Sequence, residues 1–313
     1  MEKDLEEKLE TIPVINIIVR FFKRIKLPGL EGLTFYDLLE LYITGIVKGA
    51  LTTRASAIAF SFLTALFPFL LFIIIVIPVI PVEGFQEQFM NFLESFLPPS
   101  TSDFFFENIF KNIESNKRGG LLSSVFVLSV LLMANGVNAI FSGFERSYHE
   151  QLTRNVFRQY IFALGIALIL AVLLIFTIVV LGYFQIYIIH ELLSELEHRG
   201  YSVDSENVFW YDVAKYVFFV LMVYIATATL YYFGTKEGRK SKFFSYGAIF
   251  TTFLIILTSY LFGIYIENFS QYNELYGSIG ALLILIFYLW LNANILLLGY
   301  ELNATLNELR TRN

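Results

Sequence analysis

Long apolar runs alternate with polar connections along this chain, and this pattern predicts its main elements. Six stretches carry no charged residue, and each is about 20 residues or longer, enough for a helix to span the roughly 30 Å hydrocarbon core of a bilayer. They are 55–82, 119–144, 159–189, 216–235, 243–266 and 275–300. Because backbone groups in hydrocarbon must be paired within the chain, these runs are expected to be helices. The predicted fold class is all-α, a polytopic membrane protein with six transmembrane helices in a domain at 55–304.

Composition supports this assignment and narrows the chemistry. Hydrophobic residues make up 57% of the chain and charged residues 16%, whereas charged residues approach a quarter of a typical soluble domain. Cysteine is absent, which excludes disulfides and thiolate metal sites. The acidic, polar start of the chain does not resemble a cleavable signal peptide.

The distribution of lysine and arginine predicts the orientation. These residues are concentrated in 1–54, in the connections 145–158 and 236–242, and in the tail 305–313, whereas the connection 267–274 has none. Basic residues accumulate in cytoplasmic loops. We therefore expect a multi-pass protein of the bacterial plasma (inner) membrane with both termini in the cytoplasm.

Segments outside the six stretches have amphipathic patterns. Residues 1–54 predict two interfacial helices, and the second is expected to begin at Thr34, a cap three residues before Asp37. These helices are expected to pack under the bundle, and the alternative is that they sense anionic lipid. The connection 83–118 predicts short amphipathic helices on the extracytoplasmic side.

Polar side chains within the apolar stretches form stripes at helical spacing, which are expected to lie in the cytoplasmic half of the membrane. The candidate residues for a substrate-binding groove are Arg54, Ser61, Thr64 and Pro68 on the first stretch, Asn135, Asn138 and Ser142 on the second, and Asn292, Asn294 and Glu301 on the sixth.

Two interpretations of these stripes remain open. Small and polar side chains let helices approach and hydrogen-bond to one another, which would make the stripes packing surfaces. Alternatively, they line a polar cavity that accepts the headgroup of an amphiphile while its chains stay in lipid. Pro68 favours the cavity, because a proline removes a backbone hydrogen bond and loosens a helix near a transport site.

Charged groups give few signs of coupled transport. No ionisable residue lies deep inside the six stretches, so a proton relay is not indicated. Arg54 and Glu301 at the inner boundary could pair with each other, hold a phosphate, or extend separately to the interface. No phosphate-binding glycine-rich loop with Lys and Ser or Thr is present, and no cofactor or metal is expected.

Several motifs resemble the YihY/BrkB family of bacterial inner-membrane proteins over roughly residues 40 to 305. They are RASAIAF at 54–60, ALFP at 65–68, YGSIGA at 276–281, YLW at 288–290 and LGYELNA at 298–304. Asn292 and Asn294 depart from the family pattern, which has small, apolar or hydroxyl residues there.

The resemblance implies a membrane protein whose relatives have been named as virulence factors and as ribonuclease BN. A metal-dependent nuclease needs clustered ligands, yet His149, His190 and His198 are isolated and fall on opposite sides of the membrane in the expected topology. We therefore expect no enzyme activity and no nucleic-acid partner.

Our leading hypothesis is that the protein moves, scrambles or binds a lipid or other amphiphile through a groove open to the cytoplasm. The alternative is a membrane scaffold without transport activity that recruits partner proteins. Membrane lipids are the expected partners in either case, and a homo-oligomer is possible because small-residue faces also serve contacts between chains.

Overall fold

A computed structural model describes residues 21–24, 34, 36–37, 50–76, 119–145, 155–183, 205–235, 238, 242–268 and 278–312. The predicted extracytoplasmic helices of 83–118, most of the N-terminal interfacial helices and all three histidines lie outside these residues.

Each apolar stretch of the sequence contributes one long helix. The helices are α4 (Ala50–Val76), α8 (Gly119–Glu145), α9 (Val156–Tyr183), α11 (Ser205–Gly234), α12 (Tyr246–Asn268) and α14 (Ser278–Arg312). Five of them, α8, α9, α11, α12 and α14, contain a segment long and apolar enough to cross a membrane, and α4 contributes a shorter apolar helix at Leu51–Leu66. The predicted all-α, multi-pass fold is confirmed.

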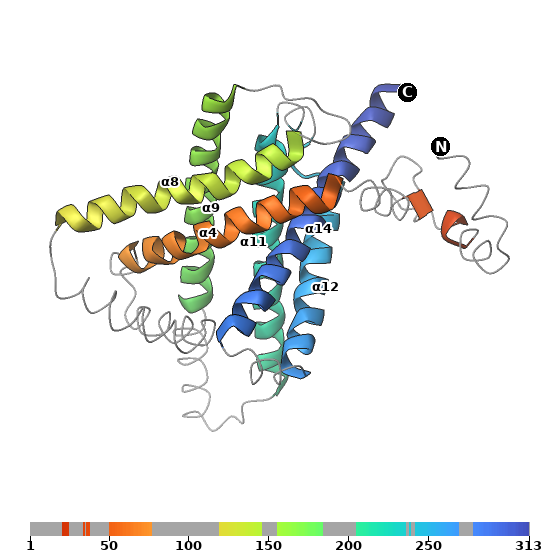
Figure 1. Ribbon diagram of the computed structural model, residues 1–313. Helices are drawn as coiled ribbons and strands as arrows, with labels where there is room; N and C mark the ends of the chain where they lie inside the picture. Colours follow the sequence, from red (N-terminus) through yellow and green to blue (C-terminus); the bar gives the residue numbers. More distant parts are fainter. Residues whose placement is uncertain are drawn as a thin grey trace.

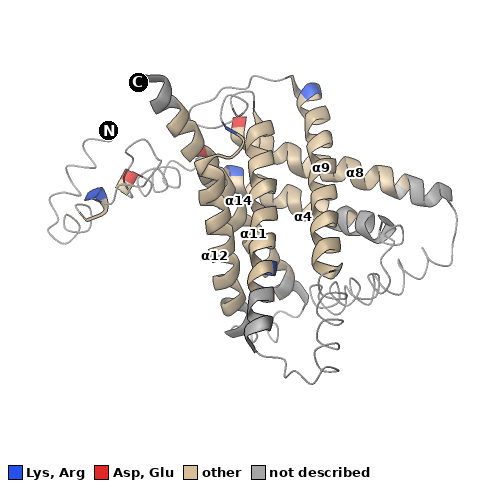
Figure 2. Ribbon diagram, turned by 180° about the vertical axis from the view of Figure 1, so that it is seen from behind, with Lys and Arg blue, Asp and Glu red and all other residues tan. Residues whose placement is uncertain are grey.

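The six helices pack in a closed ring. Each one contacts two principal neighbours, in the order α4, α8, α9, α11, α12, α14 and back to α4. Figure 1 shows α9, α11 and α12 running alongside one another, with α14 crossing diagonally. The α4 and α8 helices lie side by side and cross α9 and α11 steeply, as the view from behind in Figure 2 also shows.

The most buried side chains gather toward one end of this ring, where α8 and α11 end and α4 and α12 begin. They include Phe141, Phe144, Leu297 and Leu302, each exposed by 1% or less. Most of the charged residues of the described helices also lie toward this end (Figure 2). We call it the joined end of the bundle.

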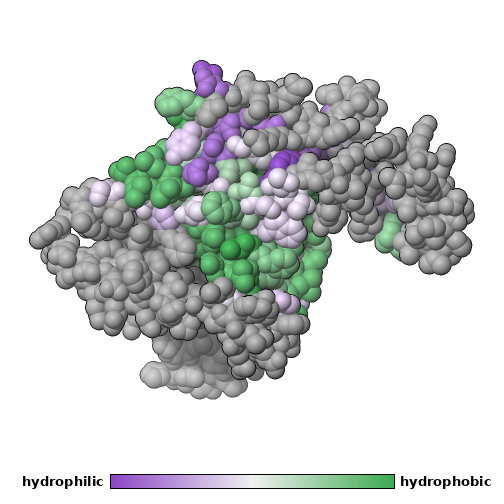
Figure 3. Space-filling model, in the orientation of Figure 1, coloured by the Kyte–Doolittle hydropathy of each residue, from purple (hydrophilic) through white to green (hydrophobic). Residues whose placement is uncertain are grey.

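Away from the joined end, the helices expose apolar side chains, as expected for surfaces that face lipid. On α9 they include Ile169, Val172 and Phe176, which share one face. Figure 3 shows apolar residues over the middle of the molecule and hydrophilic ones above them.

The predicted cap at Thr34 is confirmed. The Thr34 hydroxyl donates to Asp37 Oδ2 at 2.8 Å, the Thr34 backbone N–H donates to the same oxygen at 2.6 Å, and the Asp37 N–H donates to Thr34 Oγ1 at 3.3 Å. These reciprocal bonds satisfy donors that a helix start leaves open. Lys23 Nζ lies 4.9 Å from the centre of the Tyr36 ring, so the two N-terminal segments touch here.

Candidate functional site

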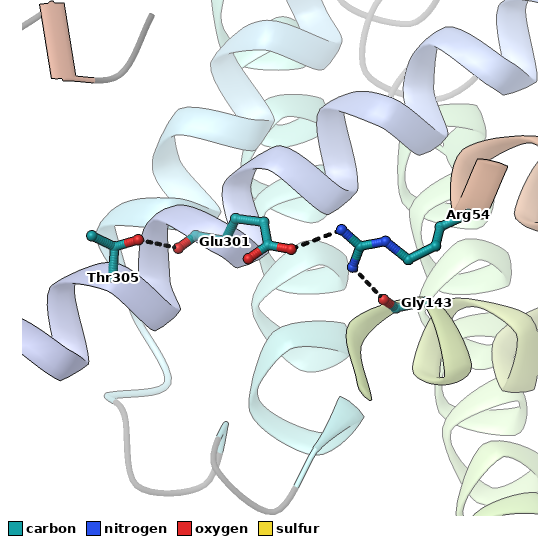
Figure 4. Close-up of polar contacts among 4 residues, drawn as sticks. All are labelled: Arg54, Gly143, Glu301 and Thr305. Atoms are coloured by element: carbon teal, nitrogen blue, oxygen red, sulfur yellow. Dashed lines mark hydrogen bonds and ion pairs between the residues drawn. The ribbon is translucent and has the colours of Figure 1, made fainter. Parts of the chain in front are cut away.

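An ion pair joins three helices at the joined end (Figure 4). Arg54 Nη2 on α4 lies 2.9 Å from Glu301 Oε1 on α14, and Arg54 Nη1 donates to the backbone carbonyl of Gly143 on α8 at 2.8 Å. The two charged side chains are only 9% and 8% exposed. The sequence left three roles open for Arg54 and Glu301: pairing with each other, holding a phosphate, or extending separately to the interface. The structure shows them paired with each other.

Glycine lets these three helices approach so closely. A Cβ added at Gly143 would lie 2.9 Å from Ile58 Cδ1 on α4 and 3.2 Å from Leu297 Cδ2 on α14. About two turns earlier on α8, a Cβ added at Gly136 would lie 3.3 Å from the Cβ of Ala65 on α4. Small residues at these positions allow backbone approach, which is the packing interpretation of the stripes.

Aromatic hydroxyl groups connect α11 to α12 and α14 beside the ion pair. Tyr231 shares a 2.5 Å hydrogen bond with Thr251, and its hydroxyl donates to the Leu296 carbonyl at 2.7 Å. Tyr300 shares a 2.6 Å bond with Thr235. All these side chains are buried, so each hydroxyl finds within the protein the partner that hydrocarbon cannot supply.

The Tyr300 ring also joins the α8 end to this network. It stacks on Phe144 with ring centres 4.2 Å apart and an interplanar angle of 10°. The same Phe144 ring meets the edge of Tyr231 at 5.6 Å. The three rings therefore link α8, α11 and α14 in one buried cluster.

Asn303 fastens α14 to the start of α12. Its Oδ1 accepts the Gly247 backbone N–H at 2.8 Å, and its Nδ2 donates to Ser245 Oγ at 2.8 Å. Gly247 lies in the first turn of α12, where the N–H has no partner within its own helix. Asn303 thus acts as a cap supplied by another helix.

Gly299 allows the closest approach between α12 and α14. A Cβ at this position would overlap Thr251 Oγ1, and it would lie 2.6 Å from the Tyr231 hydroxyl and 2.9 Å from the Gly247 carbonyl oxygen. The stretch 298–304, which carries part of the family resemblance, is therefore a helix junction in which Gly299, Tyr300, Glu301 and Asn303 each contact another helix.

The other predicted residues of α4 lie away from this junction. Ser61 and Pro68 are half-buried, and Thr64 is exposed. The Thr64 hydroxyl donates to the backbone carbonyl of Ser61 at 2.9 Å, within its own helix. This bond satisfies the Thr64 donor and leaves its oxygen able to accept.

The predicted residues of α8 divide between two surroundings. Asn135 is exposed, on a face that also exposes Leu128 and Leu131. Asn138 and Ser142 are half-buried, and Ser142 Oγ accepts a 3.1 Å hydrogen bond from Gln159 on α9. Ser142 therefore helps to pack α8 against α9.

The two predicted asparagines of α14 bond to their own helix. Asn292 Nδ2 donates to the Tyr288 carbonyl at 2.9 Å, and Asn294 Nδ2 donates to the Trp290 carbonyl at 2.8 Å. Among the predicted residues, Arg54 and Glu301 are thus brought together. The side-chain amides of Asn292 and Asn294 instead bond to carbonyls of their own helix.

The sequence reading missed the residues that form most of the junction, including Gln159, Tyr231, Thr235, Ser245, Gly247 and Thr251. One signal was available for Tyr231, because a tyrosine well inside an apolar stretch needs a partner for its hydroxyl. Glu145, at the end of α8, is only 1% exposed. Its position just after the apolar stretch 119–144 did not indicate that it would be buried. Within the described helices, no group of three His, Asp or Glu side chains is placed to hold a metal ion.

Comparisons with known proteins agree with the fold. The family model for virulence factor BrkB matches residues 43–313. The chain is 26% identical over 261 residues to a ribonuclease-like protein, YfkH, of Bacillus subtilis (strain 168), covering 82% of this chain and 90% of that protein. It is 24% identical over 290 residues to a UPF0761 membrane protein of Coxiella burnetii, covering 90% of this chain and 94% of that one.

A second UPF0761 membrane protein, from Psychrobacter sp. (strain PRwf-1), is 23% identical over 291 residues. The match covers 91% of this chain but only 51% of that longer protein. No solved structure matches the chain.

Proposed function

Because this chain belongs to the virulence factor BrkB family of membrane proteins, we propose that it binds a lipid or other amphiphile at polar positions on α4 and α8 and moves it between leaflets. The proposal rests on one observation above all: Asn135 is exposed on an α8 face that also exposes the apolar side chains of Leu128 and Leu131.

An exposed amide within an apolar helix is costly in hydrocarbon. Transferring an amide from water to an alkane without a hydrogen-bond partner costs roughly 4 to 8 kcal/mol. Polar residues at membrane depth therefore usually face water, another polar group or a substrate pathway. A lipid headgroup passing along α8 would supply such a partner to Asn135.

Neighbouring residues extend this polar strip. Asn138 lies one turn further along α8 and is half-buried. Thr64 on α4 is exposed and has an oxygen able to accept. Because α4 and α8 pack side by side, these groups offer an amphiphile donors and acceptors beside exposed apolar side chains such as Phe60.

The headgroup site proposed in this way has fewer residues than the groove expected from the sequence. Asn292 and Asn294 donate to their own helix, and Arg54 and Glu301 neutralise each other. We therefore assign headgroup contact to Asn135 and Asn138, with Thr64 as a further acceptor, and leave out Arg54 and the residues of α14.

Reconstitution tests the proposal. Purified protein in vesicles of phosphatidylethanolamine and phosphatidylglycerol should expose fluorescent lipid of the inner leaflet to an impermeant quencher faster than empty vesicles do. The double substitution Asn135→Leu with Asn138→Leu should return exchange to the level of empty vesicles, because the strip loses its amides while the helix keeps its bulk.

A matched variant controls for the loss of a polar atom inside a span. Thr177→Val on α9 removes a buried hydroxyl that donates to the Leu173 carbonyl of its own helix at 2.7 Å, and it should exchange lipid as the natural chain does. Full activity in the Asn135 and Asn138 double variant would refute the groove. No exchange by the natural chain with any headgroup, together with a protein that purifies with it in fixed ratio, would favour the scaffold.

A further inference from the structure

The α4 and α8 helices form a closely packed pair. A Cβ at Gly136 would lie 3.3 Å from the Ala65 Cβ and 3.8 Å from the Ser61 carbonyl oxygen, so the two backbones nearly touch at this level. Ile58 packs against Gly143 closer to the joined end. The contact therefore continues over several turns of both helices.

Side chains of this pair contact α14 at the joined end. Arg54 meets Glu301, and Phe144 stacks on Tyr300. Further along α4, Phe60 is 68% exposed and Thr64 is also exposed. Figure 1 shows α14 crossing this pair diagonally.

A buried ion pair at such a crossing differs from an apolar contact. Desolvating two charges offsets much of their attraction, so a well-packed apolar pair is often at least as stable, whereas a charge left alone is strongly unfavourable. The Arg54–Glu301 ion pair therefore favours one position of α4 against α14 and disfavours small displacements from it. The two side chains remain 9% and 8% exposed.

We propose that the α4 and α8 pair moves as one body against α14, and that the Arg54–Glu301 ion pair is the latch that holds its closed position. The movement would widen the angle between the pair and α14 while the contact between Gly136 and Ala65 stays intact. This inference concerns the motion itself and does not depend on the amphiphile function.

Paired spin labels test the latch directly, because the chain has no cysteine of its own. One label pair, Phe60→Cys with Phe287→Cys, reports the distance from α4 to α14 at sites that are 68% and 49% exposed. In full-length protein in lipid vesicles, this distance should have one narrow distribution. Glu301→Gln should add a second, longer distance, because the neutral amide no longer holds the guanidinium.

A second label pair distinguishes this movement from general loosening. Phe60→Cys with Leu128→Cys spans α4 and α8, and its distance distribution should stay unchanged in the Glu301→Gln background. The exchange Arg54→Glu with Glu301→Arg rebuilds a pair of opposite sign and should return part of the population to the shorter α4–α14 distance. The latch is refuted if Glu301→Gln leaves the α4–α14 distribution unchanged, or if both label pairs broaden together.

Discussion

Replacing Gly299 with alanine puts a methyl group into the tightest contact of the helix junction. The new Cβ would overlap Thr251 Oγ1, with the Tyr231 hydroxyl at 2.6 Å and the Gly247 carbonyl oxygen at 2.9 Å. Either α12 and α14 must separate, or the bond between Tyr231 and Thr251 must break. Both groups are buried, so neither finds water as a substitute.

The expected loss of stability follows from these two effects. Overpacking a core costs about 1 to 3 kcal/mol and leaving a buried hydroxyl unsatisfied about as much again, which predicts a total of about 2 to 6 kcal/mol. Titrating detergent-solubilised protein with sodium dodecyl sulfate, followed by far-ultraviolet circular dichroism, measures this difference.

Gly165→Ala on α9 is the matched control, because a Cβ there meets no atom within 4 Å. It should leave stability unchanged or raise it by up to about 1 kcal/mol, through the better helix propensity of alanine. Adding Thr251→Ala to Gly299→Ala removes the overlapping oxygen and should recover part of the loss. If Gly299→Ala unfolds at the same detergent concentration as Gly165→Ala, the close approach of α12 and α14 is wrong.

Three further predictions concern other parts of the fold. Tyr300→Phe removes the bond to Thr235 and keeps the ring stack, so it should cost about 0.5 to 1.5 kcal/mol in the same titration, and a loss above about 3 would contradict this. Gly136→Cys with Ala65→Cys should form a disulfide on mild oxidation, seen as a reducible gel shift, because the 3.3 Å separation is close to the roughly 3.5 to 4.5 Å between Cβ atoms of natural disulfides. Lys242→Cys, at an exposed position, should resist an impermeant maleimide in intact cells and react after lysis, and labelling in intact cells would overturn the expected orientation.

The sequence predicted the six helices because the signal for each is strong and local. Burying some 20 apolar residues in lipid outweighs individual side-chain preferences, so hydropathy alone locates the runs. The ends were less well determined. α11 begins at Ser205 and α14 continues to Arg312, beyond the apolar runs 216–235 and 275–300, because a helix can continue through polar residues that lie outside the hydrocarbon core.

The candidate site was predictable only in part, because contacts between helices depend on rotation about each helix axis. Arg54 and Glu301 were recognised as possible partners because opposite charges at one boundary are few. Nothing in the local pattern showed that Asn135 would face outward while Gly136, its neighbour, faces Ala65. One residue of rotation, about 100° of the helix turn, separates these two outcomes.

The separation of 247 residues between Arg54 and Glu301 has a consequence for synthesis of the chain. At a translation rate of about 5 to 20 residues per second, the arginine is added to the chain roughly 12 to 50 s before its carboxylate partner. During that interval, the guanidinium must be accommodated by phosphates at the membrane surface or by the insertion machinery. Assembly of α4 and α8 against α14 therefore occurs only after all six described helices have been synthesised.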